Sequence, residues 1–371
     1  MNPRYGVFRR EGEPARVGAL LEDGVVDLAA AARAGKLAEV PDAERVFSAA
    51  SLNPFMALGR EAWSAGLEQV RDLDASLPLA EVEPLLPIEV ADYVDFYSSR
   101  HHAENAGRIF RPGAEEPLSP NWRSLPVGYH GRAGTVVPSG TPVVRPCGQF
   151  WGEGGPEHGP TRALDIELEL GFVIGTPSRH GEPVGVGEAL EHVFGLVLLN
   201  DWSARDIQIW ETVPLGPFLG KSFATSIGAW VAPLETLVGR RVPGERQEPP
   251  PLEYLRAEPL VFDLELEVSL NGATIVRTNA RHLYWTVEQQ IAHLTANGAS
   301  LRAGDLLGSG TISGPEREQR GCLLELSWNG AEPFELPDGS TRTYLEDGDE
   351  VVLRGEGLSE VRGVVQSSPN T

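Results

Sequence analysis

Cysteine is scarce in this chain of 371 residues, which contains only Cys147 and Cys322. Two cysteines cannot build a disulfide framework or a cysteine-rich zinc site, and neither has neighbours at metal-ligand spacing. We therefore interpret both as small core residues rather than as nucleophiles.

Long apolar runs are also missing. No stretch approaches the roughly 20 apolar residues that a membrane-spanning helix needs, and the N-terminal residues lack the apolar segment of a signal peptide. We expect a soluble, cytoplasmic protein that has no membrane partner.

Positive charge is the third deficit. Lys and Arg together number 31 against 53 Asp and Glu, which leaves a formal net charge of −22. Such a charge disfavours nucleic acids and anionic membrane surfaces as partners. The 41% hydrophobic content is enough for a large core, and the length is enough for two domains.

Short β-rich runs and turns fill the first 35 residues. The Asp23-Gly24 pair between two such runs is typical of a hairpin, and residues 57–73 have the periodicity of a helix. These elements predict a small β-barrel with helical additions. Because residues 75–88 contain three prolines and no clean period, we place a domain boundary there, giving domains 1–87 and 88–371.

Strands dominate the remainder. Asn271-Gly272 predicts a hairpin between residues 262–270 and 273–276, and a capping box at 286–289 predicts the start of a helix that stops at residues 297–298. Residues 321–328 alternate as in a strand, which would direct Glu325 away from the face of Leu324 and Trp328. We expect a mainly β protein with few helices.

Two segments alternate acidic and apolar residues. In residues 164–170, strand geometry places Asp165, Glu167 and Glu169 on one face. Neighbouring carboxylates repel unless water or a cation compensates them, and carboxylates alone suit hard cations such as calcium, magnesium or manganese. Residues 262–268 repeat the pattern with Asp263, Glu265 and Glu267. Either strand face could simply be solvated, so the pattern alone does not identify a site.

Polar groups concentrate again between residues 200 and 225. The apolar run 193–199 predicts a buried strand that delivers Asp201 to its carboxyl end. If residues 201–208 form a short helix, then Asp201, Arg205 and Gln208 share one face. The alternative is a solvated helical turn with one exposed ion pair.

Two adjacent histidines, His101 and His102, follow another acidic segment. Histidine titrates near neutrality, so one of them could act as a general base. The alternative for each is an ordinary surface or core histidine.

Five blocks of this chain, in the same order, resemble the fumarylacetoacetase family. Together they cover roughly residues 88–365. The blocks are DYVDFYSSRHHA at 92–103, NWRSLPVGYHGRA at 121–133, LDIELE at 164–169, NDWSARDIQ and PLGPFLGKSFAT within 200–225, and SGTISGP with LELSW within 309–328.

The resemblance implies a fold and a reaction. The fold would be a β-roll behind a small SH3-like N-terminal barrel, and the protein would be a homodimer. The reaction would be hydrolysis of a carbon–carbon bond in 4-fumarylacetoacetate, an anionic β-diketo acid, to fumarate and acetoacetate at the end of tyrosine degradation. Alternatives are a related acylpyruvate hydrolase, an oxo-acid isomerase or decarboxylase, or a metal-stabilised structural or binding protein that has lost catalysis.

The resemblance also implies roles for individual residues. His102 would be the general base, oriented by Glu325. The groups that hold the developing oxyanion would be Arg205, Gln208 and Lys221. A Ca2+ or Mg2+ ion, with Mn2+ as an alternative, would be bound by Asp95, Glu167, Glu169 and Asp201, with Lys221 and Thr225 close by. The positions that match substrate contacts are Tyr97, Arg111, Tyr129, Gln208, Thr212 and Thr311.

Two positions depart from the family pattern. Thr212 stands where the family usually carries a substrate-contacting tyrosine, and Ala224 stands where it usually has glycine. The first departure affects the far end of the substrate pocket, and the second affects a turn.

Overall fold

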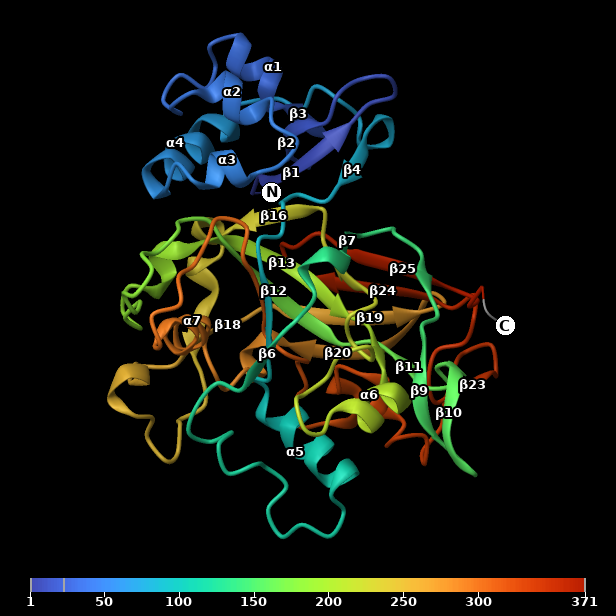
Figure 1. Ribbon diagram of the computed structural model, residues 1–371. Helices are drawn as coiled ribbons and strands as arrows, with labels where there is room; N and C mark the ends of the chain where they lie inside the picture. The colour runs from blue at the N-terminus through green and yellow to red at the C-terminus, as the bar shows by residue number, and fades with distance from the viewer. Residues whose placement is uncertain (1, 23, 370–371) are drawn as a thin grey trace.

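A 12-stranded sheet forms the centre of the protein, for which a computed structural model describes residues 2–22 and 24–369 (Figure 1). Its main path runs β3-β2-β1-β16-β13-β12-β21-β5-β6. Its strands are β1 (Arg4–Arg9), β2 (Arg16–Leu20), β3 (Val25–Asp27), β4 (Glu83–Leu85), β5 (Tyr93–Phe96), β6 (Gly128–His130), β7 (Val136–Pro138), β12 (Leu168–Ile174), β13 (Val193–Asp201), β15 (Thr225–Ile227), β16 (Trp230–Pro233) and β21 (Leu306–Gly308).

A five-stranded sheet packs against this one, and four two-stranded ladders flank it. The five strands are β8 (Val143–Val144), β19 (Glu265–Leu270), β20 (Ala273–Asn279), β24 (Glu350–Gly355) and β25 (Val361–Gln366). The ladders pair β9 (Cys147–Gly152) with β10 (Gly155–Pro160), β11 (Leu164–Asp165) with β14 (Ser203–Ala204), β17 (Arg241–Pro243) with β18 (Leu260–Phe262), and β22 (Phe334–Glu335) with β23 (Thr341–Arg342).

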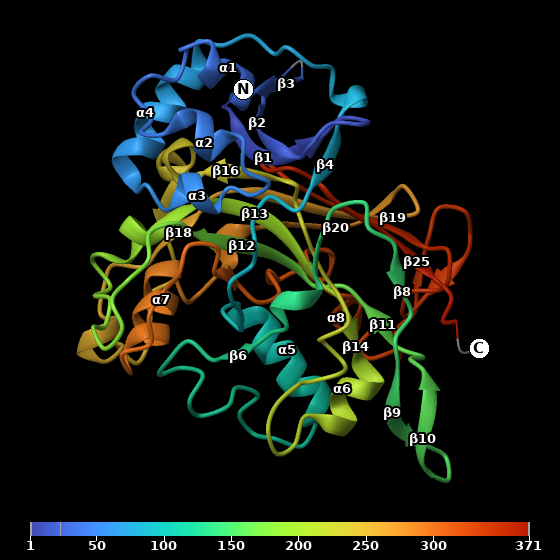
Figure 2. The same ribbon diagram turned by 45° about the horizontal axis from the view of Figure 1, so that its top comes forward.

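Helices cover the ends of the sheets. They are α1 (Leu28–Arg33), α2 (Ala43–Phe47), α3 (Asn53–Met56), α4 (Arg60–Arg71), α5 (Arg100–Phe110), α6 (Arg205–Glu211), α7 (Val287–Thr295) and α8 (Leu323–Leu326). Figure 2 shows α1–α4 at the N-terminal end and α5, α6 and α8 at the opposite side of β12 and β13. In the described part of the chain, none of the helices has the length and apolar character needed to cross a bilayer.

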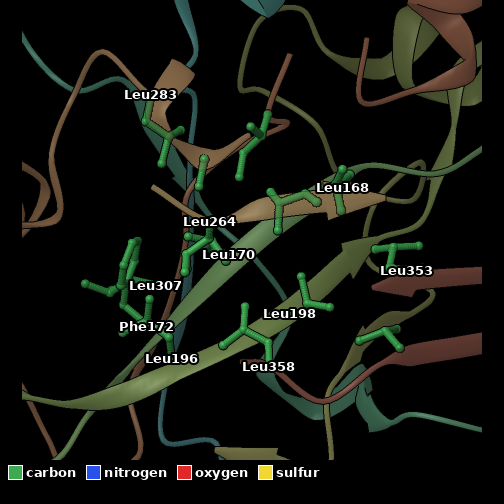
Figure 3. Close-up of a cluster of buried hydrophobic side chains, with 14 of the residues drawn as sticks. Leu168, Leu170, Phe172, Leu196, Leu198, Leu264, Leu283, Leu307, Leu353 and Leu358 are labelled. Atoms are coloured by element: carbon green, nitrogen blue, oxygen red, sulfur yellow. The ribbon is translucent and has the colours of Figure 1, made fainter. Parts of the chain in front are cut away.

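The main core lies between the two sheets (Figure 3). Leu168 and Leu170 of β12 and Leu198 of β13 are fully buried and belong to the same cluster as Leu264 and Leu353. Burying such side chains contributes about 1.5–3 kcal/mol each, so this layer fixes β12 and β13, the two strands that carry the acidic residues described below.

The N-terminal unit joins the large sheet directly. Tyr5 of β1 pairs with Val231 of β16, and Gly6 pairs with Trp230. A Cβ atom at Gly6 would lie 2.5 Å from the carbonyl oxygen of Ala229, so glycine permits this close approach. The domain boundary at residues 87 and 88 stays a prediction. Strand β1, which precedes it, and strand β16, which follows it, belong to one continuous sheet.

Several local expectations are confirmed. The mainly β architecture is present, helix α4 covers the predicted helical segment, and β19 and β20 form the predicted hairpin at residues 271–272. Thr286 and Gln289 form the predicted capping box of α7. Strands β2 and β3 pair antiparallel, whereas Asp23 of the predicted turn lies outside the described residues.

Two local expectations are wrong. Residues 323–326 form helix α8 and not a strand, so Glu325 does not alternate with Leu324. Helix α6 begins at Arg205, whereas Asp201 is the last residue of β13, so Asp201 does not share a helical face with Arg205 and Gln208. In both places tertiary hydrogen bonds override the local pattern. At α8 the Leu323 amide donates to Asp165. At Asp201 the amide donates to the Glu167 carbonyl oxygen, and the carboxylate accepts from Thr225.

Candidate active site

Three carboxylates from separate strand ends meet at one point. Asp95 comes from β5, Glu167 precedes β12, and Asp201 ends β13. The pairing of Leu168 with Asn200 sets Glu167 beside Asp201. One carboxylate oxygen from each of the three acids lies within 4.8 Å of the others, and all three side chains are buried.

Glu169 lies next to this group, beside Asp95. A Cβ atom at Gly308 of β21 would lie 2.5 Å from Asp95 Oδ1 and 2.9 Å from Glu169 Oε2, so only glycine leaves room for both carboxylates. The Gly310 amide donates to Glu169 Oε2 at 2.9 Å. Among the described residues, none donates a hydrogen bond to Asp95 Oδ1 or to Glu169 Oε1, although both atoms are buried.

These four acids fit a hard metal ion. Burial, reinforced by Asp201 for Asp95 and by Asp95 for Glu169, raises the pKa of both carboxyls well above their ordinary values. Buried oxygens that lack a donor, in a donor set made only of carboxylates, are what a divalent cation of the calcium or magnesium type would satisfy.

Lys221 supplies a fixed positive charge to the cluster. Its Nζ donates to Glu167 Oε2 at 2.5 Å and to Asp201 Oδ2 at 2.7 Å. Burial alone would lower the pKa of Lys221, but Asp201 and Glu167 outweigh it and raise the pKa. An ammonium group has no lone pair, so Lys221 acts here as a counter-ion to the acids.

Two hydroxyl groups complete the environment of Asp201. Thr225 Oγ1 donates to Asp201 Oδ1 at 2.8 Å, and the Tyr129 hydroxyl donates to Asp201 Oδ2 at 2.8 Å. These bonds fix the orientation of the Asp201 carboxylate.

Arg205 is held by two acids and an amide. Its Nε donates to Asp165 Oδ2 at 2.8 Å, and its Nη1 lies 2.7 Å from Glu167 Oε1 and 3.1 Å from Gln208 Oε1. Within the described residues, Arg205 Nη2 has no hydrogen-bond partner although it is buried. Nη2 is therefore shut off from solvent, while Arg205 and Gln208 both line one cavity.

His102 and Glu325 form a buried pair. His102 Nδ1 lies 2.6 Å from Glu325 Oε2, Asn105 donates to Glu325 Oε1 at 2.8 Å, and Ser313 donates to Oε2 at 2.7 Å. Burial would raise the pKa of Glu325, but His102 and these donors outweigh it and lower the pKa to about 2. The carboxylate thus stays charged and fixes the histidine ring.

The neighbouring residues clarify which histidine belongs to the site. His101 is half-buried, and its ring lies 5.9 Å from the ring of His282.

The two cysteines differ in burial. Cys322 is buried, as expected, and its Sγ donates to Glu325 Oε2 at 3.2 Å. Burial raises the pKa of its thiol. Cys147 is only half-buried.

One cavity of about 430 Å³ connects most of these groups. The site residues expected from sequence that line it are Asp95, Tyr97, His102, Tyr129, Glu167, Arg205, Gln208, Thr212, Lys221 and Thr311. Its apolar wall includes Phe110, Val127, Leu215 and Leu324.

Arg111 is not brought to this cavity. It follows the end of α5, is exposed, donates to the carbonyl oxygen of Pro117, and lines an adjacent hollow with Tyr97. Sequence reasoning also missed Asn105 and Ser313. Asn105 lies three residues after His102 on α5, so helical spacing could have indicated it.

A buried histidine–glutamate pair, two buried cationic side chains and a cluster of carboxylates surround one cavity on a mainly β fold, as in a candidate hydrolase site. Residues 2–82 match the family described as "Fumarylacetoacetase N-terminal", and residues 92–366 match "Fumarylacetoacetate (FAA) hydrolase C-terminal". The chain belongs to the fumarylacetoacetate hydrolase family.

Curated relatives agree with this assignment. The chain is 47% identical to the fumarylacetoacetase of Mus musculus over 95% of this chain and 90% of that one. It is 45% identical to the fumarylacetoacetase of Oryza sativa subsp. japonica, over 96% and 91%.

Structures of lower identity share the fold. The fumarylacetoacetate hydrolase from Exiguobacterium antarcticum has a TM-score of 0.59 at 18% identity, covering 98% of this chain and 99% of that one. The 5-carboxymethyl-2-hydroxymuconate delta-isomerase from Mycobacterium smegmatis has a TM-score of 0.55 at 19% identity, covering 98% and 99%.

Proposed function

We propose that this protein hydrolyses 4-fumarylacetoacetate to fumarate and acetoacetate, the last step of tyrosine degradation. The observation that carries the proposal is the contact of 2.6 Å between His102 Nδ1 and Glu325 Oε2 at a cavity that also contains Arg205 and Lys221. Relatives named fumarylacetoacetase match nearly the whole chain at 45–47% identity, which supports this substrate.

The base is the imidazole of His102. With Nδ1 bound to Glu325, Nε2 is the ring nitrogen left to take a proton from a water molecule in the cavity. Glu325 favours the imidazolium that forms, since its carboxylate is ionised and buried. Hydroxide would then add to the substrate ketone.

The oxyanion of the tetrahedral intermediate needs donors that are already in place. Arg205, Gln208 and Lys221 line the same cavity and are proposed to supply these donors. Preorganised donors of this kind lower the barrier by about 2.7–4 kcal/mol each. The imidazolium of His102 is the acid available to return a proton to the leaving carbanion.

A Ca2+, Mg2+ or Mn2+ ion would be held by Asp95, Glu167, Glu169 and Asp201, with Thr225 and Lys221 fixing the acids. When bound, such an ion supplies Lewis-acid stabilisation of negative charge on diketone and enolate oxygens. Tyr97, Tyr129, Thr212 and Thr311 are proposed to contact the substrate. The role of Arg111 stays a prediction, because its side chain lines the adjacent hollow.

A homodimer and a cytoplasmic location complete the proposal. Apolar side chains are unusually exposed around the cavity mouth: Val213 is 82% exposed, Leu215 96% and Phe218 66%. Leu215 also lines the cavity, so a second subunit that covers this segment would dry the site.

Turnover by the purified protein tests the proposal. Wild type should hydrolyse fumarylacetoacetate in preference to acylpyruvates, and chelation should abolish turnover until Mg2+ or Ca2+ is restored. His102→Ala should lower kcat by roughly 100–10,000-fold, the usual contribution of a general base. The matched control His101→Ala should stay within about threefold, and an active His102→Ala variant would overturn the base assignment.

A further inference from the structure

Asp165 is a buried carboxylate that the proposed mechanism does not use. It is fully buried and does not line the cavity. Its Oδ1 accepts hydrogen bonds from the amides of Ile166 and Leu323, both at 2.7 Å. Its Oδ2 accepts from the Leu324 amide at 2.9 Å and from Arg205 Nε at 2.8 Å. A buried charge with four donors is fixed in one orientation.

One side of Asp165 holds the helix that carries Glu325. Leu323 and Leu324 are the first residues of α8, so their amides have no partners inside the helix. A helix of four residues is not stable by itself, because nucleation is unfavourable. The Asp165 carboxylate satisfies both amides and thereby fixes the backbone from which Glu325 reaches His102.

The other side of Asp165 holds Arg205. Strands β11 and β14 pair Asp165 with Ser203, and the Arg205 amide donates to the carbonyl oxygen of Ala163 at 2.9 Å. A guanidinium is planar, so fixing Nε by Asp165 and Nη1 by Glu167 also fixes the direction of the unpartnered Nη2. Arg205 is one of the groups assigned above to the oxyanion.

We infer that Asp165 is a positioning residue that holds the His102–Glu325 pair and the Arg205 guanidinium in one fixed geometry. Helix α8, which carries Glu325, and the oxyanion group Arg205 come from segments far apart in sequence, and this carboxylate contacts both. The catalytic part of the inference rests on the proposed function. The structural part, a coupling between Arg205 and the His102–Glu325 hydrogen bond, stands apart from it.

Asp165→Asn tests the positioning role. The amide keeps the shape but replaces one acceptor oxygen by a donor that faces N–H groups. We expect kcat to fall about 100-fold with KM changed less than about threefold, as for residues that orient catalytic groups. In a Glu325→Gln background the same substitution should cost less than about fivefold, because the geometry it supports is already lost. Equal fold losses in both backgrounds, or a kcat within threefold of wild type, would overturn the inference.

A matched control is available on α6. Asp206 neighbours Arg205 in sequence and accepts hydrogen bonds from Thr161 Oγ1 and the amides of Arg162 and Ile207. Among the described residues, none of the hydrogen bonds found for its side chain comes from Arg205 or α8. Asp206→Asn should leave the ratio of kcat to KM within about threefold of wild type. A loss equal to that of Asp165→Asn would mean that any disturbance of this region is sufficient, and would overturn the specific role.

Proton NMR gives a readout that is independent of turnover. The downfield N–H resonance of His102, hydrogen-bonded to Glu325, should shift in Asp165→Asn and stay in place in Asp206→Asn. If Asp165→Asn does not fold, Arg205→Lys serves instead, since it removes the Nε donor without touching His102 or Glu325. An unshifted resonance in folded Arg205→Lys would overturn the coupling, whereas a wild type that is inactive on fumarylacetoacetate would overturn only the proposed function.

Discussion

Residues 164–169 and residues 262–267 have the same alternation of acidic and apolar residues but opposite environments. Glu167 of the first segment has a side chain that is 7% exposed and contacts Arg205 and Lys221. Glu267 of the second has a side chain that is 28% exposed and lies 3.2 Å from Arg277 and 3.5 Å from Arg354. Each glutamate therefore has two cationic partners, and the two glutamates differ in how far they are buried.

The neighbours of each strand explain the difference. Strand β12 lies between β13 and β21 inside the 12-stranded sheet, and every one of its residues is buried. Strand β19 lies between β20 and β24, and its acidic face is turned to solvent. A charge pair removed from water cannot be replaced by hydration, whereas an exposed pair can. The same motif is thus part of a buried carboxylate cluster in one sheet and a partly solvated face in the other.

Glu167→Gln should give the largest contrast. It leaves Lys221 and Arg205 buried with a missing counter-charge, and breaking a buried pair costs about 3–5 kcal/mol of unfolding free energy. Glu267→Gln removes the equivalent exposed contacts and should cost less than about 1 kcal/mol. Denaturant unfolding in Mg2+ buffer measures both. Equal losses for the two variants would contradict the role given to burial.

Gly308→Ala should produce the next largest effect. The added Cβ would crowd Asp95 and Glu169, at an expected cost of about 1–3 kcal/mol, and should weaken binding of Mg2+ or Ca2+ at least tenfold. Calorimetric titration of Mg2+ or Ca2+ into protein freed of metal by a chelator measures the affinity. The control is Gly355→Ala beside β19, where the new Cβ would meet the flexible ends of Leu266 and Leu198 at 3.0 and 3.1 Å. Unchanged metal affinity in Gly308→Ala would place the ion elsewhere.

The smallest expected effect is a change in thermal stability with pH, caused by ionisation of Glu325. The folded protein lowers the pKa of Glu325 from 4.5 to about 2, so the folded state binds fewer protons than the unfolded state in that range. The stabilisation is present above about pH 4.5 and is lost as the pH falls toward 2. The difference in Tm between wild type and Glu325→Gln should therefore narrow with falling pH.

The partly exposed carboxylate of Asp263 provides the comparison. Hydrogen bonds from Asn279 and Arg281 lower its pKa, and it remains at the surface. We expect the Tm difference of Asp263→Asn to shrink when salt is added, because exposed charges are screened, whereas that of Glu325→Gln should persist. Salt sensitivity of the Glu325 effect would contradict its burial.

Local chemistry predicted the turns and caps of this fold. Asn271-Gly272 and the Thr286 capping box depend on a few adjacent residues, and both formed as expected. Helix α8 could not be predicted from periodicity, because four residues make about one turn and the carboxylate of Asp165, far away in sequence, holds that turn. Asp201 ends a strand for a similar reason, since its position is set by pairing with Thr225.

The candidate site could be predicted only in part from the residues. The acidic pattern offered two equal candidates, and resemblance to a family selected Glu167 and Glu169. Burial of those two depends on β13 and β21, which are distant in sequence, so no local signal distinguishes them from Glu265 and Glu267.

The pairing between β1 and β16 also bears on how the chain can be cut. Strand β16 is bonded to β13 on one side and to β1 on the other. Deleting roughly the first ninety residues would expose backbone donors and acceptors of β16, together with the apolar side chains that β1 covers. An exposed strand edge of this kind pairs with other chains. We therefore expect fragments of the chain that lack the N-terminal segment to self-associate and precipitate.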